Sequence, residues 1–331
     1  MIGRYWDLAG GIQVESVDAG LNNPTFRVSA GRWRYAARLY RNLDPASIRR
    51  EHGLIDVLAA AGLSFRVPGP APCRDGTTLA QTPHGCLALF DWVDGQHADP
   101  NDPRHLRAMG AALAELDQTL LRLDGTLARL PGEPAPKHGQ FDRIHPAVPD
   151  PRKLAARLAA EASLQDVAAE IAWLGAAIAA CLATVPGLYA TLPQQWIHQD
   201  LAQSNVLQVG GRVTGVLDFE FSDRDLRALD LVAMLANCVS GFWDHMGWQQ
   251  AEALCRGYCS RVHLTEAEVA AIPDLMRLRY AVANIHGAGR WLAGLNPTEE
   301  VIRRLRHGAA CDGMVQRGAD RLLGLIHSAT G

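Results

Sequence analysis

The chain has 331 residues, enough for one large domain or two moderate ones. With 48% hydrophobic and 20% charged residues it is typical of a globular protein, and a formal net charge of -3 gives no reason to expect nucleic acid or an anionic membrane as a partner. The 7 cysteines include no CxxC pair, so neither a disulfide framework nor a zinc site is predicted. The N-terminal residues lack the apolar segment of a signal peptide, and the longest apolar run, 171–183, is shorter than a membrane span and predicts a buried helix. We therefore expect a cytoplasmic, reducing location.

Strands dominate the predicted structure of the N-terminal part. Residues 25–29 and 32–40 flank the turn signal Ala30-Gly31, which predicts a β-hairpin. Because side chains alternate along a strand, Arg38 lies on the face opposite Trp33.

A helix is predicted next in the chain. Asp44 is a good N-cap residue, and Pro45 suits the first helical position. The apolar stripe of this helix, which ends before Gly62, consists of Ile48, Ile55 and Leu58. Glu51 lies on the same stripe, and a carboxylate on a buried face needs a cationic partner because burial of an unpaired charge is costly.

Helices dominate the rest of the chain. Asn101 or Asp102 is predicted to cap a helix that begins near Pro103. The remaining predicted elements are strands at 78–81 and 86–93, a proline-rich loop at 131–151, an alanine-rich helix at 152–183, a strand pair at 206–218, and helices from 226 to the end. The sequence therefore predicts a small sheet-rich lobe of residues 1–94, a hinge near 90–95, and a larger helical lobe of residues 95–331.

One segment carries the pattern of phosphoryl-transfer chemistry. His198-x-Asp200 is followed, after four residues, by Asn205, which is the spacing of a kinase catalytic loop. Asp218 comes later, at the end of an apolar run. Between them, Gly210-Gly211 is a favourable two-residue hairpin turn, so the chain on either side is predicted to pair as antiparallel strands.

The predicted hairpin brings the two ends of this segment together. Counting back along the ladder from the turn places Asn205 opposite Val216 and Gln203 opposite Asp218. Asn205 and Asp218 then leave the hairpin at the same end, with oxygen ligands of the kind that Mg²⁺ prefers. Asp200 lies just upstream, where it is able to accept the proton of a substrate hydroxyl. The alternative is an ordinary hairpin in which Asp and Asn are placed by turn preference.

These motifs resemble a known group of enzymes. HQDLAQSN at 198–205 and GVLDFEFSDRDLRALDLVAML at 215–235 are similar to the core of the aminoglycoside phosphotransferase superfamily, which includes type II homoserine kinases and choline and ethanolamine kinases. The resemblance extends more weakly over most of the chain. It implies an α+β, two-lobed protein-kinase-like fold with a small antiparallel-sheet N-lobe and a larger mostly helical C-lobe. It also implies transfer of the γ-phosphate of ATP or GTP, with Mg²⁺, to the hydroxyl of a small metabolite.

The resemblance also implies roles for individual residues. It marks Asp200 as the catalytic base, Asn205 and Asp218 as Mg²⁺ ligands, and Asp230 as a structural aspartate that braces the catalytic loop. His198 belongs to the catalytic motif, where we expect a buried hydrogen-bonding strut more than an acid or base. The segment CLALFDWVDG at 86–95 is similar to the last strand and hinge of the nucleotide lobe, which places Phe90 and Trp92 at the nucleotide.

The chain departs from the family pattern in two places. The family usually has a lysine on the third strand, whereas Arg38 stands at the matching position and offers a planar fork in place of a compact ammonium. We infer that Arg38 pairs with Glu51 and contacts the nucleotide phosphates; the alternative is a solvated strand arginine. No GxGxxG is present, so the loop at 19–24 must cover the phosphates with Asn22 and Asn23.

The acceptor is less well defined by the sequence. Glu220 is a possible second metal contact or a surface carboxylate. Candidate substrate contacts are an aromatic wall of Trp243, Trp248, Tyr258 and Trp291, or carboxylate-binding arginines among Arg277, Arg279 and Arg290, although such residues are more often core or surface residues. The acids in 241–300 are spread apart, which favours an amino alcohol or hydroxy amino acid over a polycationic antibiotic.

Other functions stay open at this level. An aminoglycoside-type antibiotic phosphotransferase and a catalytically weak, nucleotide-binding regulatory protein are both compatible with the fold. A protein-serine kinase is disfavoured because recognisable DFG and APE segments are absent. The expected partners are a nucleotide and a small hydroxylated substrate, and the sequence predicts no oligomeric state.

Overall fold

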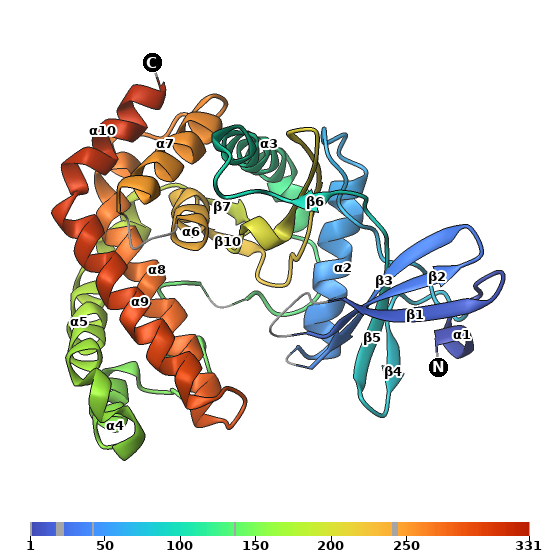
Figure 1. The fold of residues 1–331 in the computed structure, drawn as a ribbon, viewed down its shortest axis with the longest axis horizontal. Coiled ribbons are helices and arrows are strands. Elements are labelled where there is room, and N and C mark those ends of the chain that lie inside the picture. The colour runs from blue at the N-terminus through green and yellow to red at the C-terminus, as the bar shows by residue number, and fades with distance from the viewer. Residues whose placement is uncertain (1, 18–22, 42, 136, 240–243, 331) are drawn as a thin grey trace.

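The computed structural model describes residues 2–17, 23–41, 43–135, 137–239 and 244–330. It has the two lobes expected from the sequence, with an antiparallel sheet at one end of the molecule and a larger, mostly helical part at the other (Figure 1). The N-terminus lies beside the sheet and the C-terminus among the helices, so the chain runs from one lobe to the other.

A five-stranded antiparallel sheet forms the N-lobe. Its strand order is β1-β2-β3-β5-β4, and the strands are β1 (Ile12–Val17), β2 (Thr25–Ala30), β3 (Trp33–Tyr40), β4 (Ala80–Thr82) and β5 (Gly85–Asp91). The predicted hairpin is present, but its turn lies one residue later than expected: Ala30 is the last residue of β2 and pairs with Trp33, so Gly31-Arg32 forms the turn, with a left-handed φ of 57° at Gly31. The strands predicted at 78–81 and 86–93 correspond to β4 and β5.

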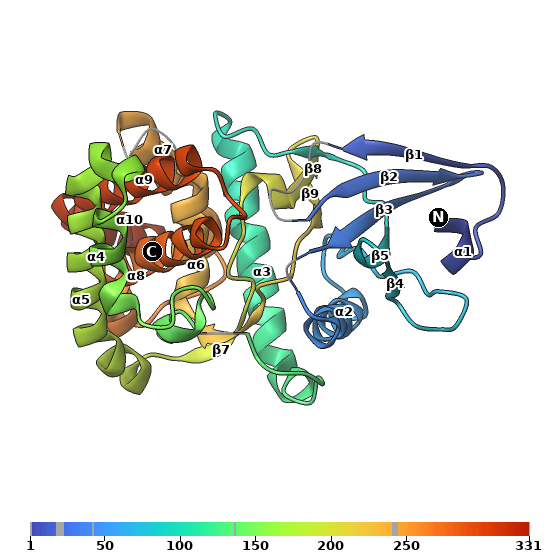
Figure 2. The same ribbon diagram turned by 90° about the horizontal axis from the view of Figure 1, so that it is seen from below.

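The two faces of this sheet pack against different segments of the chain, and Figure 2 shows α2 beside the strands. On one face, Trp6 next to the short helix α1 (Ile2–Tyr5) packs into a small apolar cluster with Ala37 and Leu89. On the other face lies α2 (Pro45–Ala59). As predicted, Asp44 caps the N-terminus of this helix by accepting hydrogen bonds from backbone N–H groups of the first turn. The apolar side of α2 joins the large core that continues into the helical lobe. Arg38, on the α2 side of β3, is therefore held between the two lobes.

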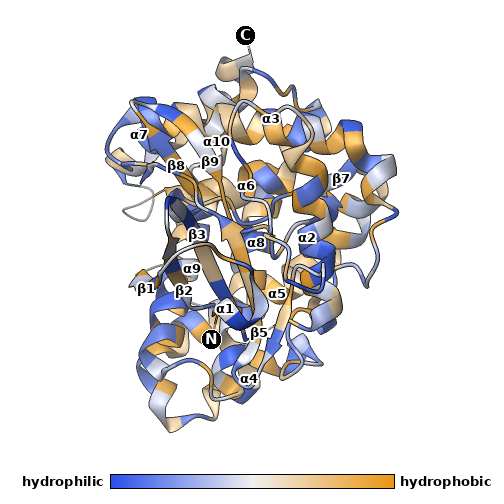
Figure 3. Ribbon diagram, turned by 90° about the vertical axis from the view of Figure 1, so that its right-hand side faces the viewer, coloured by the Kyte–Doolittle hydropathy of each residue, from blue (hydrophilic) through white to orange (hydrophobic). Residues whose placement is uncertain are grey.

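The C-lobe is built around long helices. Its elements are β6 (Gln96–His97), α3 (Pro103–Leu127), two 3₁₀ turns η1 (Phe141–Arg143) and η2 (Pro151–Lys153), α4 (Leu154–Ala159), η3 (Ala162–Val167), α5 (Ala168–Thr191), β7 (Gln194–Ile197), η4 (Gln203–Asn205), β8 (Val206–Val209), β9 (Arg212–Val216), β10 (Asp223–Leu226), α6 (Ala228–Cys238), α7 (His245–Cys259), α8 (Glu266–Leu292), α9 (Thr298–Arg317) and α10 (Ala319–Thr330). Asp102 caps α3, as predicted. Figure 3 shows hydrophobic and hydrophilic segments alternating along α2 and α3, as expected for helices that cover a core on one side.

The alanine-rich region differs from its prediction. The expected continuous helix at 152–183 is broken into η2, α4, η3 and α5, and α5 continues to Thr191. Its buried positions carry the larger side chains and its outer positions are mainly alanine, so the run 171–183 is a half-buried helix and the prediction of a buried one was wrong. The stretch 162–191 is long and apolar enough to cross a membrane by length and composition alone, a test that core helices also pass.

Candidate active site

One buried carboxylate from α6 holds the loop between β7 and β8. Asp230 accepts hydrogen bonds from the backbone N–H groups of His198 at 2.7 Å and Gln199 at 2.8 Å. Two donors that converge on one carboxylate fix the local backbone, and Gln199 has a left-handed φ of 69° at this point. Asp230 therefore has the geometry of a brace for the loop that carries Asp200.

A second buried carboxyl supports this brace from behind. The hydroxyl of Tyr258 in α7 donates to Oδ2 of Asp117 in α3 at 2.7 Å. Burial, and then the negative charge of Asp230, raise the pKa of Asp117 well above its usual range. Asp117 and Tyr258 thus lie behind Asp230, where α3 and α7 pack against α6.

His198 is bonded to the backbone through both ring nitrogens. Its Nδ1 accepts from the N–H of Asp200 at 3.3 Å, and its Nε2 lies 3.1 Å from the carbonyl oxygen of Leu217. This network assigns a neutral imidazole with the proton on Nε2. The ring is completely buried and lies 4.8 Å from the ring of Phe219. His198 is thus positioned as a buried strut between the catalytic loop and the residue that follows β9, and its ring is not exposed.

The hairpin is present, but its predicted register is wrong by one residue. β8 and β9 pair as Val209–Arg212 at the turn and as Val206–Val216 at the far end, with a bulge between them. The extra residue is Thr214, whose carbonyl accepts from Arg66 N at 2.9 Å and whose hydroxyl donates to the carbonyl of Asp94 at 2.8 Å. These contacts outside the hairpin compete with the ladder and produce the bulge. Asn205 consequently pairs with Leu217, through a 2.8 Å bond from Leu217 N to Asn205 O.

Asp200 is anchored through one of its two oxygens. Its Oδ1 accepts from Asn237 Nδ2 and from Arg279 Nη2, each at 3.0 Å. Its Oδ2 has no hydrogen bond from the described residues, and 29% of the side chain is exposed. Burial raises the pKa of Asp200, the charge of Arg279 opposes that rise, and the charge of Asp218 adds to it. The carboxylate is thus fixed on one side and open on the other.

Asn205 and Asp218 provide the oxygen donors expected of a magnesium site. Asn205 Nδ2 donates to the carbonyl of Asp200 at 2.9 Å, and the amide oxygen of Asn205 accepts only a long 3.5 Å contact from the hydroxyl of Ser204, which a metal ion can replace. Asp218, next to the Leu217 that pairs with Asn205, adopts a left-handed φ of 67°. No cluster of three or more His, Cys, Asp and Glu side chains forms a metal site in the described parts of the chain. One amide oxygen and one carboxylate nevertheless fit Mg²⁺, which retains waters and phosphate oxygens as its other ligands.

Arg38 contacts three carboxylates, one from its own lobe and two from the C-lobe. Its guanidinium lies 2.7 Å from Asp218, 3.1 Å from Glu220 and 3.5 Å from Glu51. The inferred pair with Glu51 is therefore present, but it is the longest of the three contacts. Three acids share one arginine here, and these charges raise the pKa of Arg38 well above its usual value despite its burial.

Glu51 has a second partner that the sequence interpretation missed. The hydroxyl of Tyr40, two residues after Arg38 and on the same face of β3, donates to Glu51 Oε2 at 2.8 Å. Burial is the main cause that raises the pKa of Glu51 to about 7, against the opposing charge of Arg38. The two-residue spacing of Arg38 and Tyr40 on one strand was the available signal for this contact.

The predicted nucleotide-binding residues occupy different surroundings. Asn23 accepts from Arg41 N at 3.1 Å and donates to Glu220 at 2.6 Å, while Asn22 falls outside the described residues. The ring of Phe90 is buried edge-on against His52, with 5.3 Å between centroids. Trp92 is half-buried, with its carbonyl accepting from an Arg66 guanidinium nitrogen at 3.3 Å. Their contact with nucleotide stays a prediction.

The proposed aromatic wall does not form among the described residues. Tyr258 is buried behind the catalytic loop, and Trp248 is buried against Arg321, 4.5 Å from its ring. Trp291 is half-buried and donates to Thr298 at 3.2 Å, and Trp243 is not among the residues described. Trp248 and Tyr258 lie in the core because large aromatic rings on these helices bury the most apolar surface there.

The candidate arginines of α8 have separate environments. Arg277 pairs with Asp312 at 3.3 Å, away from the loop, whereas Arg279 bonds Asp200 directly. Arg290 donates to the amide oxygen of Asn296 at 3.0 Å. Asn237, the other partner of Asp200, was missed by the sequence interpretation, although it follows Asp230 by seven residues and so lies on the same face of α6.

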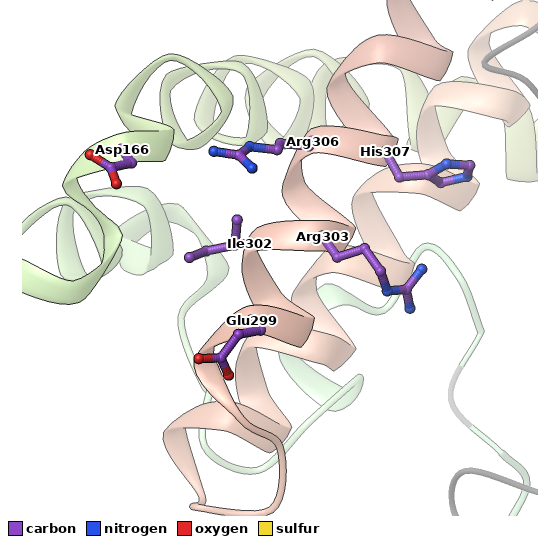
Figure 4. A pocket seen from close by; sticks show the side chains of 6 residues that line it. All are labelled: Asp166, Glu299, Ile302, Arg303, Arg306 and His307. Atoms are coloured by element: carbon purple, nitrogen blue, oxygen red, sulfur yellow. The ribbon is translucent and has the colours of Figure 1, made fainter.

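A separate hollow lies on the outer side of the helical lobe. It has a volume of about 610 Å³ and is lined by side chains from η3 and α9, as Figure 4 shows. Its lining residues are Asp166, Glu299, Ile302, Arg303, Arg306 and His307. None of them belongs to the catalytic loop or contacts Asp200, so this hollow is distinct from the candidate active site.

Comparison with known proteins identifies the family. The model of the phosphotransferase enzyme family matches residues 13–271, which include the braced loop, the hairpin and Arg38. The chain belongs to this family. It is a phosphotransferase, and specifically a small-molecule kinase that acts on a hydroxyl group.

The individual proteins that resemble this chain share only a low sequence identity with it. The chain is 26% identical over 306 residues to a homoserine kinase of Sinorhizobium fredii, covering 89% of this chain and 87% of that protein. Two solved structures share the fold: a microcompartment-associated aminopropanol kinase (TM-score 0.65, 18% identity, 96% of each chain) and the amicoumacin kinase hAmiN in complex with AMP-PNP, Ca²⁺ and Ami (TM-score 0.63, 15% identity, 93% of this chain and 91% of that one). These likenesses confirm the protein-kinase-like fold.

Proposed function

We propose that this phosphotransferase moves the γ-phosphate of ATP onto a small acceptor whose hydroxyl is bound by Asp200. The observation that carries the proposal is the asymmetric environment of that carboxylate. Oδ1 is anchored by Asn237 and Arg279, and Oδ2 is open on the exposed side. As the acceptor oxygen attacks phosphorus, Asp200 takes the hydroxyl proton on Oδ2, and the ADP oxygen leaves in line with the attack.

The nucleotide phosphates are assigned to the residues that join the lobes. Asn205 and Asp218 would hold Mg²⁺, which supplies charge neutralisation at the transferred phosphoryl group. When the nucleotide binds, Arg38 gives up part of its contact with Asp218 and Glu220 and binds phosphate oxygens instead. Its planar guanidinium is able to contact two anions at the same time. The AMP-PNP in the structurally similar amicoumacin kinase supports an adenine nucleotide.

The remaining assignments follow from the same proposal. Asn22 and Asn23 cover the phosphates, and Phe90 and Trp92 lie toward the base. We place the division between lobes at residues 94–95, where the carbonyl of Asp94 bonds Thr214 of the C-lobe hairpin at 2.8 Å. A cytoplasmic location fits an enzyme that consumes ATP.

The acceptor is proposed to be a hydroxy amino acid or an amino alcohol. Homoserine kinase and aminopropanol kinase among the similar proteins support this class. An aminoglycoside is disfavoured because the acceptor side near Asp200 presents Arg279 and Arg290, and a polycation would be repelled there.

The test is a coupled assay of ADP release with ATP or GTP and a panel of hydroxy amino acids, amino alcohols, sugars and aminoglycosides. We expect acceptor-dependent turnover with a small metabolite, reduced to background in Asp200→Asn. Turnover with aminoglycosides alone would reassign the enzyme to antibiotic modification. Nucleotide binding without turnover for any acceptor would favour the regulatory alternative.

A further inference from the structure

A single stripe of α8 leads away from the catalytic aspartate. Between Arg279 and Arg290 this helix is buried except for four residues that are partly exposed, which are Arg279, Ala283, His286 and Arg290. Their spacing of four, three and four residues places them on one helical face. The stripe begins at Asp200, because Arg279 bonds its Oδ1. It is therefore a natural wall for the acceptor.

Three further side chains close around this wall. The rings of His286 and His145 lie 5.9 Å apart, and Phe221, next to Glu220, contacts His286 edge-on at 6.2 Å. Arg304 reaches the wall from α9, where its side chain lies directly against Gly287 of α8. The cluster thus joins α8, α9, the proline-rich loop and the segment after Asp218.

Two glycines of α8 allow this close approach. A Cβ at Gly287 would lie 2.7 Å from Arg304 Cδ, and a Cβ at Gly289 would lie 2.3 Å from His145 Cγ. Glycine inside a helix costs about 1 kcal/mol relative to alanine. The helix thus contains two unfavourable residues at the positions where Arg304 and His145 rest against it.

The positive charge of this cluster is incompletely balanced. Arg279 is paired with Asp200, and Arg304 with Glu300 at 2.6 Å. Arg290 forms its hydrogen bond with the neutral amide of Asn296, and within the described residues no carboxylate pairs with it. Burial and the charge of Arg304 lower the pKa of Arg290, and burial lowers that of His286 to about 4, so the imidazole is neutral at pH 7. Glu220 opposes the effect on Arg290 but is already bonded to Asn23 and Arg38.

We propose that Arg290 binds a carboxylate of the acceptor, with Arg304 and His286 beside it, so that the substrate is a hydroxy acid. This deepens the proposed function and rests on it. An arginine fork matches a carboxylate with two parallel hydrogen bonds, and the terminal nitrogens of Arg290 have no such bond from the described residues. The hydroxyl end lies at Asp200. Arg279 and Arg290 lie roughly 16 Å apart along the helix axis, so a short acceptor contacts both ends of the site only when the long side chain of Arg290 extends toward Asp200.

Three matched acceptors test the proposal. L-homoserine carries both an ammonium and a carboxylate, 4-hydroxybutanoate lacks the ammonium, and 3-amino-1-propanol lacks the carboxylate. We expect kcat/KM for the two carboxylates to exceed that for the amino alcohol. Arg290→Gln should lower kcat/KM for the carboxylates by about 10- to 100-fold, the usual effect of losing a charged hydrogen bond, and leave 3-amino-1-propanol unchanged.

A matched control is the exposed Arg256→Gln, which removes an arginine from a surface pair with Glu252 and should change none of the three values. Melting temperatures of both variants verify that they are folded. Equal use of 3-amino-1-propanol, or an Arg290→Gln variant with unchanged carboxylate kinetics, would overturn the proposal. So would a higher KM for ATP with an unchanged KM for the acceptor, because it would assign Arg290 to the nucleotide phosphates.

A binding measurement separates this proposal from the proposed function. If none of the three compounds is phosphorylated, calorimetry on the ADP-bound enzyme still reports on the subsite. Binding of the carboxylates that Arg290→Gln abolishes would support the subsite while rejecting the kinase assignment for these acceptors. Absence of binding by both carboxylates would overturn the subsite itself.

Discussion

The pair formed by Arg38 and Glu51 allows the interlobe network to be tested quantitatively. Glu51 is almost completely buried and accepts from Tyr40 at 2.8 Å as well as facing Arg38 at 3.5 Å. Removal of one member of a buried pair typically costs about 3–5 kcal/mol, because the other charge is left uncompensated. The coupling itself should be smaller, about 1 kcal/mol within the usual range of about 0.5–3 kcal/mol for contacting residues, since Arg38 shares its charge with Asp218 and Glu220.

The assay is a double-mutant cycle with Arg38→Met and Glu51→Gln, measured by urea unfolding at pH 8, where Glu51 is ionised. The exposed pair of Arg256 and Glu252 provides the control, because its atoms are closer, at 2.8 Å, yet solvent screens them. We expect less coupling in the control than in the buried pair. A coupling energy of zero between Arg38 and Glu51 would refute the reasoning and leave Tyr40 as the only functional partner of Glu51.

Three further predictions concern single residues. Asp218→Ala should abolish turnover and the thermal stabilisation by ATP with Mg²⁺, while the ligand-free protein stays folded with a melting temperature lowered by the loss of the closest partner of Arg38; stabilisation that survives the change, or that needs no Mg²⁺, would reject the metal assignment. Asp200→Asn should lower kcat by about 10²- to 10⁴-fold with little change in nucleotide Kd, whereas joint loss of stability and nucleotide affinity would reduce Asp200 to a structural role. Glu51, whose pKa burial raises to about 7 from 4.5, binds its proton more tightly in the folded state than in the unfolded state. The free energy of unfolding should therefore fall as pH rises across that window, by up to about 1.4 kcal/mol per pH unit, and a pH titration of Glu51→Gln should lack this decrease.

Local sequence determined much of the N-lobe and the catalytic hairpin. Asp44 and Asp102 cap their helices, Gly210-Gly211 makes the predicted turn, and the first hairpin turns within one residue of its prediction, because each of these signals acts between residues that are neighbours in the chain. The buried position of Glu51 was likewise readable from helical periodicity, and the need to balance its charge pointed to Arg38.

Contacts between distant segments decided what the sequence left open. The bulge at Thr214 arises from hydrogen bonds to Arg66 and Asp94. These partners lie far away in the chain, so the sequence of the hairpin does not predict the bulge. The alanine-rich segment has helical propensity throughout, yet packing against its neighbours determined where it breaks.

The acceptor side was decided by tertiary structure for the same reason. Arg279 and Asn237 lie on different helices, and only the packing of α8 against α6 brings both to Asp200. From the sequence alone, Arg279 and Arg290 could not be distinguished from other arginines that are expected at the surface. Burial beside Asp200, and the absence of a carboxylate at Arg290 within the described residues, distinguish them. The strength of a charge depends on its desolvation and its neighbours, and both exist only in the folded protein.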